Sequence, residues 1–160
     1  MPATDDLYLR DIEESDMDIF FAHQSDEVAN HMAAFTPKES TNRDAFDARW
    51  QRLRNHSGVF VQTAVYHEKV IGHVASFKQE EQREVTYWLA RECWGQGLAT
   101  KVLQQFLHNE KERPLWGRCA KDNLASVRVM EKNGFVLVGE EKGFANARQH
   151  EIEELVLRLD

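Results

Sequence analysis

The 160-residue sequence predicts an α/β domain of the α+β kind, whose central sheet is mixed and mostly antiparallel. Three β-rich runs follow one another between Val59 and Leu89, which is typical of an antiparallel meander. The last run leads through a glycine turn into a helix and another strand, and such a unit is expected to form a right-handed parallel crossover. No repeat, low-complexity tract or linker interrupts this order, so we expect one domain over residues 1–160.

The segment before the meander predicts one strand and two helices. Leu7–Arg10 has the composition of a short strand. Ser15 is the predicted N-cap of the first helix, and Thr41 is the predicted N-cap of the second. The stretch Asp26–Lys38 between the helices has no clean period, so we expect an irregular or broken helical connection there. The second helix carries three apolar residues at helical spacing: Phe46, Trp50 and Leu53.

The meander is predicted from a change of hydrophobic period after residue 58. Its first two runs are separated by the dipeptide His67-Glu68, which indicates a hairpin. The charged stretch Lys78–Arg83 is expected to bridge the second run to the third. The three runs are Val59–Tyr66, Lys69–Phe77 and Glu84–Leu89.

The second half of the chain alternates helices and strands. Leu98–Leu107 carries the apolar stripe of a helix, and Leu115–Cys119 is the strand expected after it. A further helix, Leu124–Asn133, should begin at Asn123 and stop at Gly134, because glycine readily takes the left-handed conformation at a helix C-terminus. The last two predicted strands are Val136–Val138 and Ile152–Leu159.

Composition and charge indicate an ordinary globular protein with an acidic surface. Apolar residues make up 42% of the chain and charged residues 29%. The formal net charge of −7 argues against nucleic acid as the main partner and suits a basic partner such as an amine. The chain has only two cysteines, and its start has no signal-like features. No apolar run approaches the roughly 20 residues that span a bilayer. We therefore expect a cytoplasmic protein without a membrane partner. The seven histidines show no metal-ligand spacing, so we expect no metal.

The stretch with the clearest chemistry is Trp94-Gly95-Gln96-Gly97-Leu98-Ala99-Thr100. Two glycines let successive backbone N–H groups converge on one point, and the following helix adds unpaired N–H groups and the positive end of its dipole. This arrangement binds anions, and phosphate is the usual one. A nucleotide P-loop would need Lys-Ser/Thr where Leu98-Ala99 stand, and a dinucleotide site would need an early parallel βαβ unit in place of the meander.

A second stretch, Asp122–Phe135, gives the glycine turn its context. Together the two stretches resemble the two signature blocks of the GNAT superfamily of N-acetyltransferases, closest to the branch typified by the Rim enzymes that acetylate the N-terminal amines of ribosomal proteins. The spacing of the blocks and the order of the elements match this family, and the resemblance spans Leu7–Leu159. One position departs from it, because Glu92 stands where the family often has Gln or Arg. Arg91 beside it could supply the missing contact to phosphate.

The resemblance implies that acetyl-coenzyme A is the acetyl donor and lies between the strands Glu84–Leu89 and Leu115–Cys119. Its pantetheine arm would pair with strand backbone as an added strand. The implied coenzyme contacts are the backbone of Trp88, Leu89 and Ala90 for pantetheine, the N–H groups of Gly95, Gln96, Gly97, Leu98, Ala99 and Thr100 for the pyrophosphate, and the side chain of Asn123.

Acetyl transfer to an amine needs a base, because a free amine holds its proton at neutral pH, with a pKa of roughly 8 for an α-amine and 10.4 for lysine. Glu84 is the candidate, since similar GNAT sequences often have a glutamate at this place. An exposed strand-end carboxylate is the competing interpretation. Strand alternation should place Glu84, Thr86 and Trp88 on one face and Val85, Tyr87 and Leu89 on the other.

The departing thiolate needs a proton, and the resemblance implies Ser126 as the residue that contacts the coenzyme sulfur. Many GNAT members use a tyrosine further along this helix, but none of the three tyrosines lies on it. Ser126 could instead bond its own helix backbone. The developing oxyanion would be met by a backbone N–H near Trp88 or Leu89.

The acceptor site is predicted least sharply. In this fold two connections usually line it, here residues 26–36 and about 142–150. From these we select His31, Phe35 and Phe144 as substrate-binding candidates, while Arg148 would suit an acceptor that also carries an anionic group. The expected acceptor is a primary amine, either a protein N-terminus or a small molecule. The alternative is a non-catalytic coenzyme A sensor or interaction module with the same fold, and either a monomer or a homodimer suits the sequence.

Overall fold

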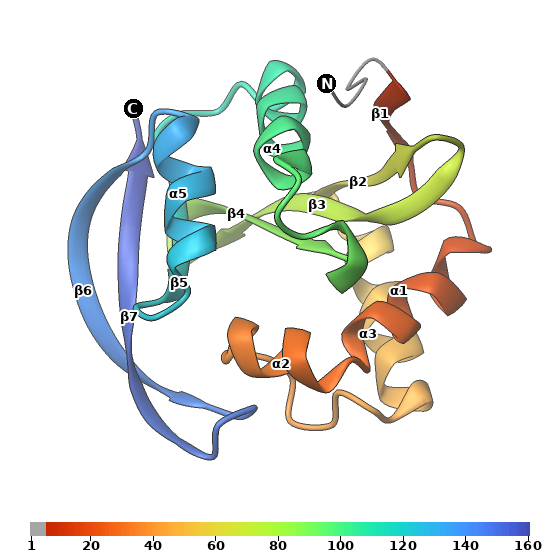
Figure 1. Ribbon diagram of the computed structural model, residues 1–160, viewed down its shortest axis with the longest axis horizontal. Helices are drawn as coiled ribbons and strands as arrows, with labels where there is room; N and C mark the ends of the chain where they lie inside the picture. The colour runs from red at the N-terminus through yellow and green to blue at the C-terminus, as the bar shows by residue number, and fades with distance from the viewer. Residues whose placement is uncertain (1–5) are drawn as a thin grey trace.

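The computed structural model describes residues 6–160, and these form one seven-stranded sheet in the order β1-β2-β3-β4-β5-β7-β6 (Figure 1). The pair β4–β5 is parallel, and every other neighbouring pair is antiparallel. The predicted mixed, mostly antiparallel sheet of the α+β class is therefore confirmed. The strands are β1 (Leu7–Asp11), β2 (Phe60–Tyr66), β3 (Lys69–Gln79), β4 (Gln82–Leu89), β5 (Leu115–Ala120), β6 (Val136–Ala145) and β7 (His150–Leu159).

The helices lie on both faces of this sheet (Figure 1). Two of them, α4 (Leu98–Asn109) and α5 (Leu124–Lys132), cover one face. The other face carries α1 (Asp16–Gln24), α2 (Glu27–Ala33) and α3 (Arg43–Asn55). A short 3-10 turn, η2 (Arg91–Cys93), follows β4. Among residues 6–160, no helix is long and apolar enough to cross a membrane.

The helix starts agree with the sequence prediction at one position and differ from it at two. Ser15 is the N-cap residue of α1, as predicted, although its side chain makes no capping hydrogen bond. Asn42 caps α3 in place of Thr41, because its Oδ1 accepts a hydrogen bond from the Ala45 N–H at 3.0 Å. The stretch predicted as irregular contains the regular helix α2, whose N-cap Asp26 accepts a hydrogen bond from an N–H of the first turn.

Both hairpins of the meander turn through two residues. His67 and Glu68 have φ values of 50° and 64°, as the predicted tight turn requires. Glu80 and Glu81 have φ values of 48° and 70°, so the charged stretch predicted as a bridge is a second tight turn. Its flanking residues consequently extend β3 and β4. Arg83, within that stretch, is held by Glu110, Ser76 and the Gly58 carbonyl, so it anchors the start of β4.

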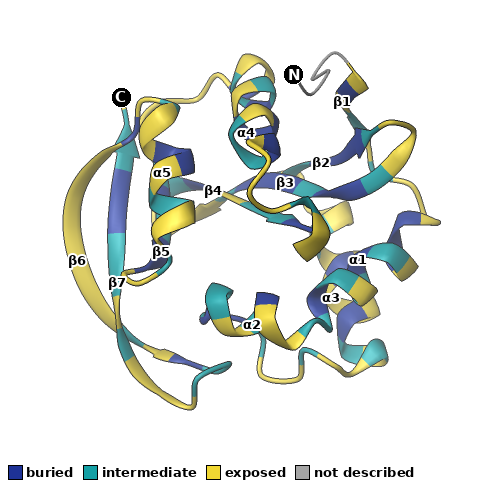
Figure 2. Ribbon diagram, viewed as in Figure 1, coloured by how far each residue is buried: buried dark blue, intermediate teal, exposed yellow. Residues whose placement is uncertain are grey.

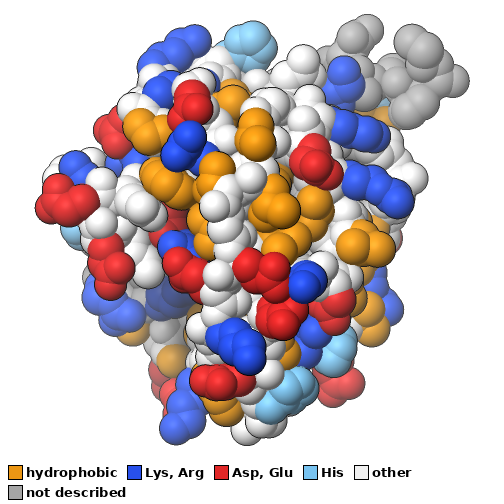
Figure 3. All heavy atoms as spheres, turned by 90° about the vertical axis from the view of Figure 1, so that its left-hand side faces the viewer, with side chains coloured by type: hydrophobic (Ala, Val, Ile, Leu, Met, Phe, Trp, Pro, Cys, Tyr) orange, Lys and Arg blue, Asp and Glu red, His pale blue; other side chains and the backbone are white. Residues whose placement is uncertain are grey.

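The edge strand β6 is longer than predicted, since it pairs with β7 from Val136 to Ala145. It is exposed along most of its length (Figure 2), which explains why no alternation of apolar residues revealed it. Figure 3 shows apolar side chains gathered on this side of the molecule. The exposed apolar residues at the start of β6 are Val136, Leu137 and Val138.

The main core lies between the sheet and the helices α4 and α5. Its fully buried centre is formed by Val102, Leu103 and Phe106 of α4 against Leu115 and Leu157 of the sheet. Gly117 lets α5 approach β5 closely, because a Cβ at this position would come within 2.6 Å of the Met130 sulfur. Both α4 and α5 are thus packed closely against this face of the sheet.

A second apolar cluster lies on the opposite face, beneath α1 and α3. Phe20, Phe46 and Trp50 are buried there together with Met17. The ring of His73 on β3 packs between Phe20 and Trp50, with ring centroids 4.8 and 4.9 Å away. Burial lowers the pKa of His73 to about 3, so this imidazole is neutral and serves packing.

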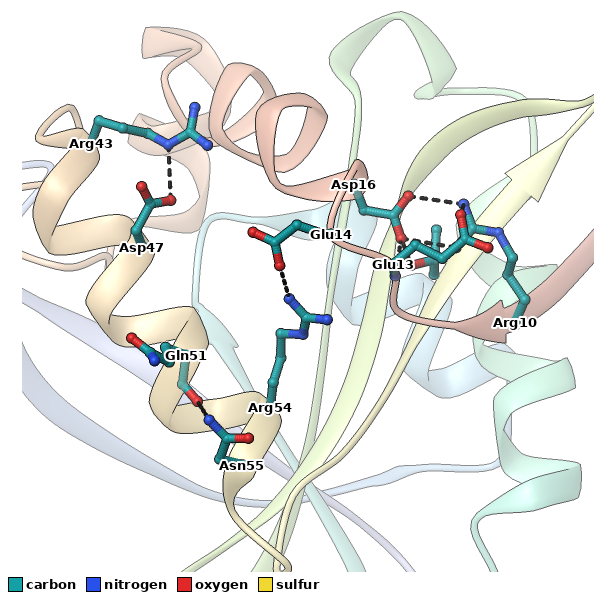
Figure 4. Close-up of polar contacts among 10 residues, drawn as sticks. Arg10, Glu13, Glu14, Asp16, Arg43, Asp47, Gln51, Arg54 and Asn55 are labelled. Atoms are coloured by element: carbon teal, nitrogen blue, oxygen red, sulfur yellow. Dashed lines mark hydrogen bonds and ion pairs between the residues drawn. The ribbon is translucent and has the colours of Figure 1, made fainter.

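Asp16 fixes the start of α1 on the sheet (Figure 4). Its side chain is only 1% exposed and accepts two hydrogen bonds from the Arg10 guanidinium, at 2.8 and 2.9 Å. It also accepts the Glu13 N–H at 2.9 Å and the Thr63 hydroxyl at 2.7 Å. Burial raises the pKa of Asp16, but these hydrogen bonds lower it more, so the carboxylate stays ionised. One buried carboxylate therefore joins β1, β2 and α1.

Replacing Asp16 with Asn should destabilise the fold by about 3 kcal/mol, because Arg10 loses its buried counter-ion. Since the pKa of Asp16 is lowered in the folded protein, this stabilisation is present above a pH of about 4 and is lost as the pH falls through the folded pKa. Urea denaturation at several pH values measures both effects. Asp18→Asn is the control, because its ion pair with Arg43 is exposed and should contribute little. Equal losses in both variants would contradict the role of Asp16.

Candidate active site

The sheet opens between β4 and β5. Their parallel pairing covers three residue pairs and ends at Val85 and Gly117, although β4 continues to Leu89 and β5 to Ala120. Beyond this point the facing backbone groups of β4 and β5 do not pair with each other. An extended ligand can therefore add to the sheet here and take these hydrogen bonds.

Leu89 presents its backbone to this opening. The neighbouring Ala90 N–H donates to the Ile71 carbonyl at 2.8 Å, and peptide groups of successive strand residues point to opposite edges. The Trp88 carbonyl also faces β3, where a Cβ on Gly72 would come within 2.0 Å of its oxygen. Of the three residues predicted to pair with pantetheine, Leu89 is thus the one whose peptide groups face the opening. Its carbonyl accepts a hydrogen bond from the Trp94 indole at 3.2 Å.

The glycine turn leads from η2 into α4 at the end of the opening. Gly95 and Gly97 have φ values of 77° and 76°, a left-handed conformation that other residues rarely adopt. Gly97 is the N-cap of α4 and has no side chain to occupy the first N–H groups of the helix, those of Leu98, Ala99 and Thr100. A Cβ at either glycine would meet no atom within 4 Å, so the turn is not packed against other parts of the protein at these positions. The binding of a pyrophosphate group by these N–H groups stays a prediction.

The side chains beside this turn make contacts within the protein. Gln96 folds back and donates to the Glu92 carbonyl at 2.9 Å. Glu92 lies 3.7 Å from Lys69, and Arg91 pairs with Asp26 of the α2 cap at 3.1 Å. Arg91 is therefore engaged away from the turn. Backbone groups remain as the anion donors of the turn.

Two hydroxyl groups meet on the side of the sheet covered by α4 and α5. The Ser126 Oγ on α5 lies 3.0 Å from the phenol oxygen of Tyr87 on β4. Burial raises the pKa of Tyr87 to about 12, so the phenol keeps its proton at neutral pH. Sequence reasoning missed Tyr87 because it looked for a tyrosine on the helix. Strand alternation, which turns Tyr87 away from the face of Glu84, was the signal that could have found it.

Asn123 occupies the corner where α5 begins. Its Oδ1 accepts the Ser126 N–H at 3.3 Å, so it caps the helix as predicted. Its amide nitrogen donates to the Met32 carbonyl of α2 at 3.3 Å. This second contact links α5 to the acceptor side of the molecule. A coenzyme contact by Asn123 stays a prediction.

Glu84 lies on the other face of the sheet, the one covered by α1, α2 and α3. It is 7% exposed and its Oε2 is 3.3 Å from the Nε of Arg118 on β5. Arg118 also contacts Glu141 at 2.6 Å and Glu154 at 3.2 Å. Burial raises the pKa of Glu84, and the Arg118 guanidinium opposes this rise. Glu84 is therefore a buried, paired carboxylate and not the solvated strand end that was the competing interpretation.

Arg118 is the second residue that sequence reasoning missed. Three carboxylates surround this one guanidinium, so the cluster keeps an excess of negative charge. The spacing of Trp116 and Arg118 along β5 could have placed both on the face of Glu84, since β4 and β5 pair in parallel with Glu84 opposite Trp116. The sequence of β5 does not show that β6 and β7 bring Glu141 and Glu154 to Arg118.

The three predicted acceptor residues do not all come together. His31 lies exposed on α2, and Phe35 packs beside β6, where a Cβ on Gly143 would come within 3.2 Å of its ring. Phe144 is 56% exposed and points away from the face that buries its neighbour Ala145. The structure therefore places Phe144 on the far side of the hairpin from Phe35. Arg148, considered for an anionic acceptor, is paired with Asp122.

The fold defines the class of this protein. A sheet that opens between β4 and β5, with a glycine turn and a helix N-terminus at the opening, is the donor-binding arrangement of the GNAT fold. The family model described as acetyltransferase (GNAT) domain matches residues 6–136. The chain belongs to this family and is an acyltransferase. Among residues 6–160, no group of three or more His, Cys, Asp or Glu side chains is arranged to hold a metal ion.

Solved structures of this fold are similar over nearly the whole chain. A RimL acetyltransferase of the ribosomal L7/L12 α-amino group, in complex with coenzyme A, is 20% identical, with a TM-score of 0.79 over 97% of this chain and 95% of the other. A Vibrio cholerae spermidine N-acetyltransferase with coenzyme A and spermine is 19% identical, with a TM-score of 0.79 over 96% of each chain. A Sinorhizobium meliloti phosphinothricin acetyltransferase with acetyl-coenzyme A is 17% identical, with a TM-score of 0.78 over 96% of this chain and 88% of the other. No curated protein sequence matches the chain.

Gly97→Ala should weaken the binding of coenzyme A by at least about tenfold, since alanine is strained at a φ of 76° and the turn that aims the α4 N–H groups must shift. Calorimetric titration with coenzyme A measures the change. Gly134→Ala is the matched control, because Gly134 also has a left-handed φ, 93°, but lies at the end of α5 and far along the chain from the turn. An unchanged affinity in folded Gly97→Ala protein would exclude the turn as the pyrophosphate site.

Proposed function

We propose that this protein transfers the acetyl group of acetyl-coenzyme A directly to a primary amine, either a protein N-terminus or a small-molecule amine. One observation carries the proposal. The β4–β5 opening has a buried carboxylate, Glu84, on one face and a hydroxyl pair, Ser126 and Tyr87, on the other. A base and a proton source on opposite sides of one opening suit a reaction in which the amine enters from one face and the thiol leaves from the other.

The donor is proposed to bind through backbone groups. The N–H groups from Gly95 to Thr100 would take the pyrophosphate, and the Leu89 peptide groups would pair with pantetheine as an added strand. Coenzyme binding must then displace or share the Trp94 indole at the Leu89 carbonyl. Bound in this way, acetyl-coenzyme A supplies an activated acetyl thioester.

Glu84 is proposed as the base that accepts a proton from the incoming ammonium group. A carboxylate serves this role only while it is ionised, and the adjacent Arg118 favours the ionised form. The burial of the Glu84 side chain raises its pKa, so Glu84 is a better proton acceptor than a solvated glutamate. The surplus carboxylates Glu141 and Glu154 favour a cationic acceptor at this face.

The hydroxyl pair is proposed to serve the leaving group. When the new C–N bond forms and the C–S bond breaks, the departing sulfur needs a proton. The Ser126 hydroxyl can donate it and be resupplied from the Tyr87 phenol, which is neutral because burial raises its pKa to about 12 and which regains its proton from solvent once the thiol has left. Tyr87 also holds the serine hydroxyl away from bonding its own helix backbone.

Acceptor-dependent thiol release tests this function. The protein is incubated with acetyl-coenzyme A and spermidine, a peptide with a free N-terminal alanine, or a free amino acid, and products are identified by mass spectrometry. We expect at least one amine to raise thiol release above hydrolysis and to be recovered as its N-acetyl product. The same peptide with a blocked N-terminus is the control. Tight coenzyme binding with no acceptor-dependent release from any of them would instead favour the non-catalytic sensor.

The pH profile of kcat/KM tests Glu84 and Arg118 together. Glu84→Gln should lower turnover by about 10²-fold or more and remove the acidic limb of the profile. Arg118→Met removes the charge that lowers the pKa of Glu84, so the pKa rises and the acidic limb moves to higher pH. Arg118→Lys keeps the charge and should shift the limb less. A Glu84→Gln profile with an unchanged acidic limb would remove Glu84 from the role.

A further inference from the structure

The short helix α2 is tied to other segments at both ends, and each tie involves an arginine. At its start, the cap residue Asp26 pairs with Arg91 of η2 at 3.1 Å. Near its end, the Nε of Arg148 donates to the His31 carbonyl at 2.9 Å. The Arg148 side chain is 8% exposed, so it lies within the protein and not in open solvent.

The end of α2 depends on donors from outside the helix. The last carbonyls of a helix have no partner within it, and a seven-residue helix offers few bonds of its own. Four carbonyls between residues 31 and 36 accept hydrogen bonds from the β6–β7 turn or from the start of α5. These are His31 O from Arg148 Nε at 2.9 Å, Met32 O from Asn123 Nδ2 at 3.3 Å, Ala34 O from Ala147 N at 3.2 Å and Thr36 O from Asn146 Nδ2 at 2.7 Å.

Arg148 joins these contacts to the coenzyme side of the site. Its Nη1 and Nη2 donate to the two carboxylate oxygens of Asp122 at 2.6 and 2.9 Å. Asp122 immediately precedes Asn123, the cap of the helix that carries Ser126. The Arg148 hydrogen bonds lower the pKa of Asp122, so the pair stays charged at neutral pH. One side chain therefore touches the β6–β7 turn, α2 and the start of α5.

Apolar packing stabilises the contact between α2, β5 and the β6–β7 hairpin only weakly. The residues buried between α2, β5 and the hairpin are Ala34, Ala120 and Ala145, with Phe35 and Ile152 at the margin. Alanine methyl groups bury little area and interlock weakly. The position of α2 relative to the sheet therefore depends chiefly on the polar ties.

We propose that Arg148 is a positioning residue for the acceptor. It holds the end of α2 and the β6–β7 turn against the Asp122–Asn123 corner. These two segments form the predicted wall of the acceptor site, so Arg148 sets the distance between this wall and the transferred acetyl group. This inference rests on the proposed acetyl transfer. Its guanidinium makes three hydrogen bonds to the protein, two of them to the Asp122 carboxylate, so its charge is already paired within the fold. Lysine cannot reproduce this fork, since it offers a single nitrogen.

Arg148→Met should raise the KM for the acceptor by about tenfold or more, because a displacement of the wall of about 1 Å is enough to disturb alignment. The affinity for coenzyme A should change much less than the KM for the acceptor, since the glycine turn is not touched and only the corner at Asn123 is shared. Arg148→Lys should recover only part of the loss, and Asp122→Asn should reproduce part of it. The probes are coenzyme A for binding, and spermidine and the alanine peptide for turnover.

Arg54→Met is the matched control, because Arg54 pairs with Glu14 at 2.6 Å on α3 and contacts neither α2 nor the hairpin. Amide hydrogen exchange of the coenzyme A complex gives a readout that needs no acceptor. Exchange in residues 31–36 and 145–149 should accelerate in Arg148→Met but not in Arg54→Met. If wild-type protein acetylates neither probe, the proposed function is in doubt and the exchange data decide the positioning role alone. If the wild type is active, an acceptor KM in Arg148→Met equal to that of the wild type would overturn the positioning role. An equal effect in Arg54→Met, or unchanged amide exchange in Arg148→Met, would overturn it as well.

Discussion

The rest of the site depends on the early end of the β4–β5 pairing. After three residue pairs the parallel ladder stops at Val85 and Gly117, and β4 continues without a neighbour on that edge. Unpaired strand groups need a partner, which makes this edge a place for an extended ligand. The same strand then runs into the glycine turn, so the peptide edge and the anion cradle lie in one continuous stretch of chain.

The two faces of β4 differ in their electrostatics. The face under α4 and α5 holds Tyr87, kept neutral by burial, and the Ser126 hydroxyl. The opposite face holds Glu84 within a group of carboxylates around Arg118. Alternation along a single strand thus places a neutral phenol and a buried carboxylate on opposite faces of the sheet.

Arginines near the opening act as ties within the protein. Arg118 joins β4, β5, β6 and β7, while Arg91 and Arg148 hold the two ends of α2. Each is engaged with carboxylates, whereas the N-terminus of α4 at the glycine turn has no side-chain cap. This division suits a donor with a pyrophosphate and an acceptor with a positive charge.

The sequence by itself determined the order of the strands, the tight turn at His67-Glu68, the glycine turn and the family, because periodicity and backbone conformation are local properties. It predicted no regular helix at α2, placed the cap of α3 one residue early at Thr41, and ended β6 early, since an exposed edge strand needs no apolar alternation. Only the tertiary structure decided that Tyr87 meets Ser126, that Arg118 holds Glu84, that Phe144 faces away from Phe35, and that Arg148 pairs with Asp122. The partner of a long polar side chain depends on strand register and helix packing between segments far apart in the chain, and no local pattern encodes it.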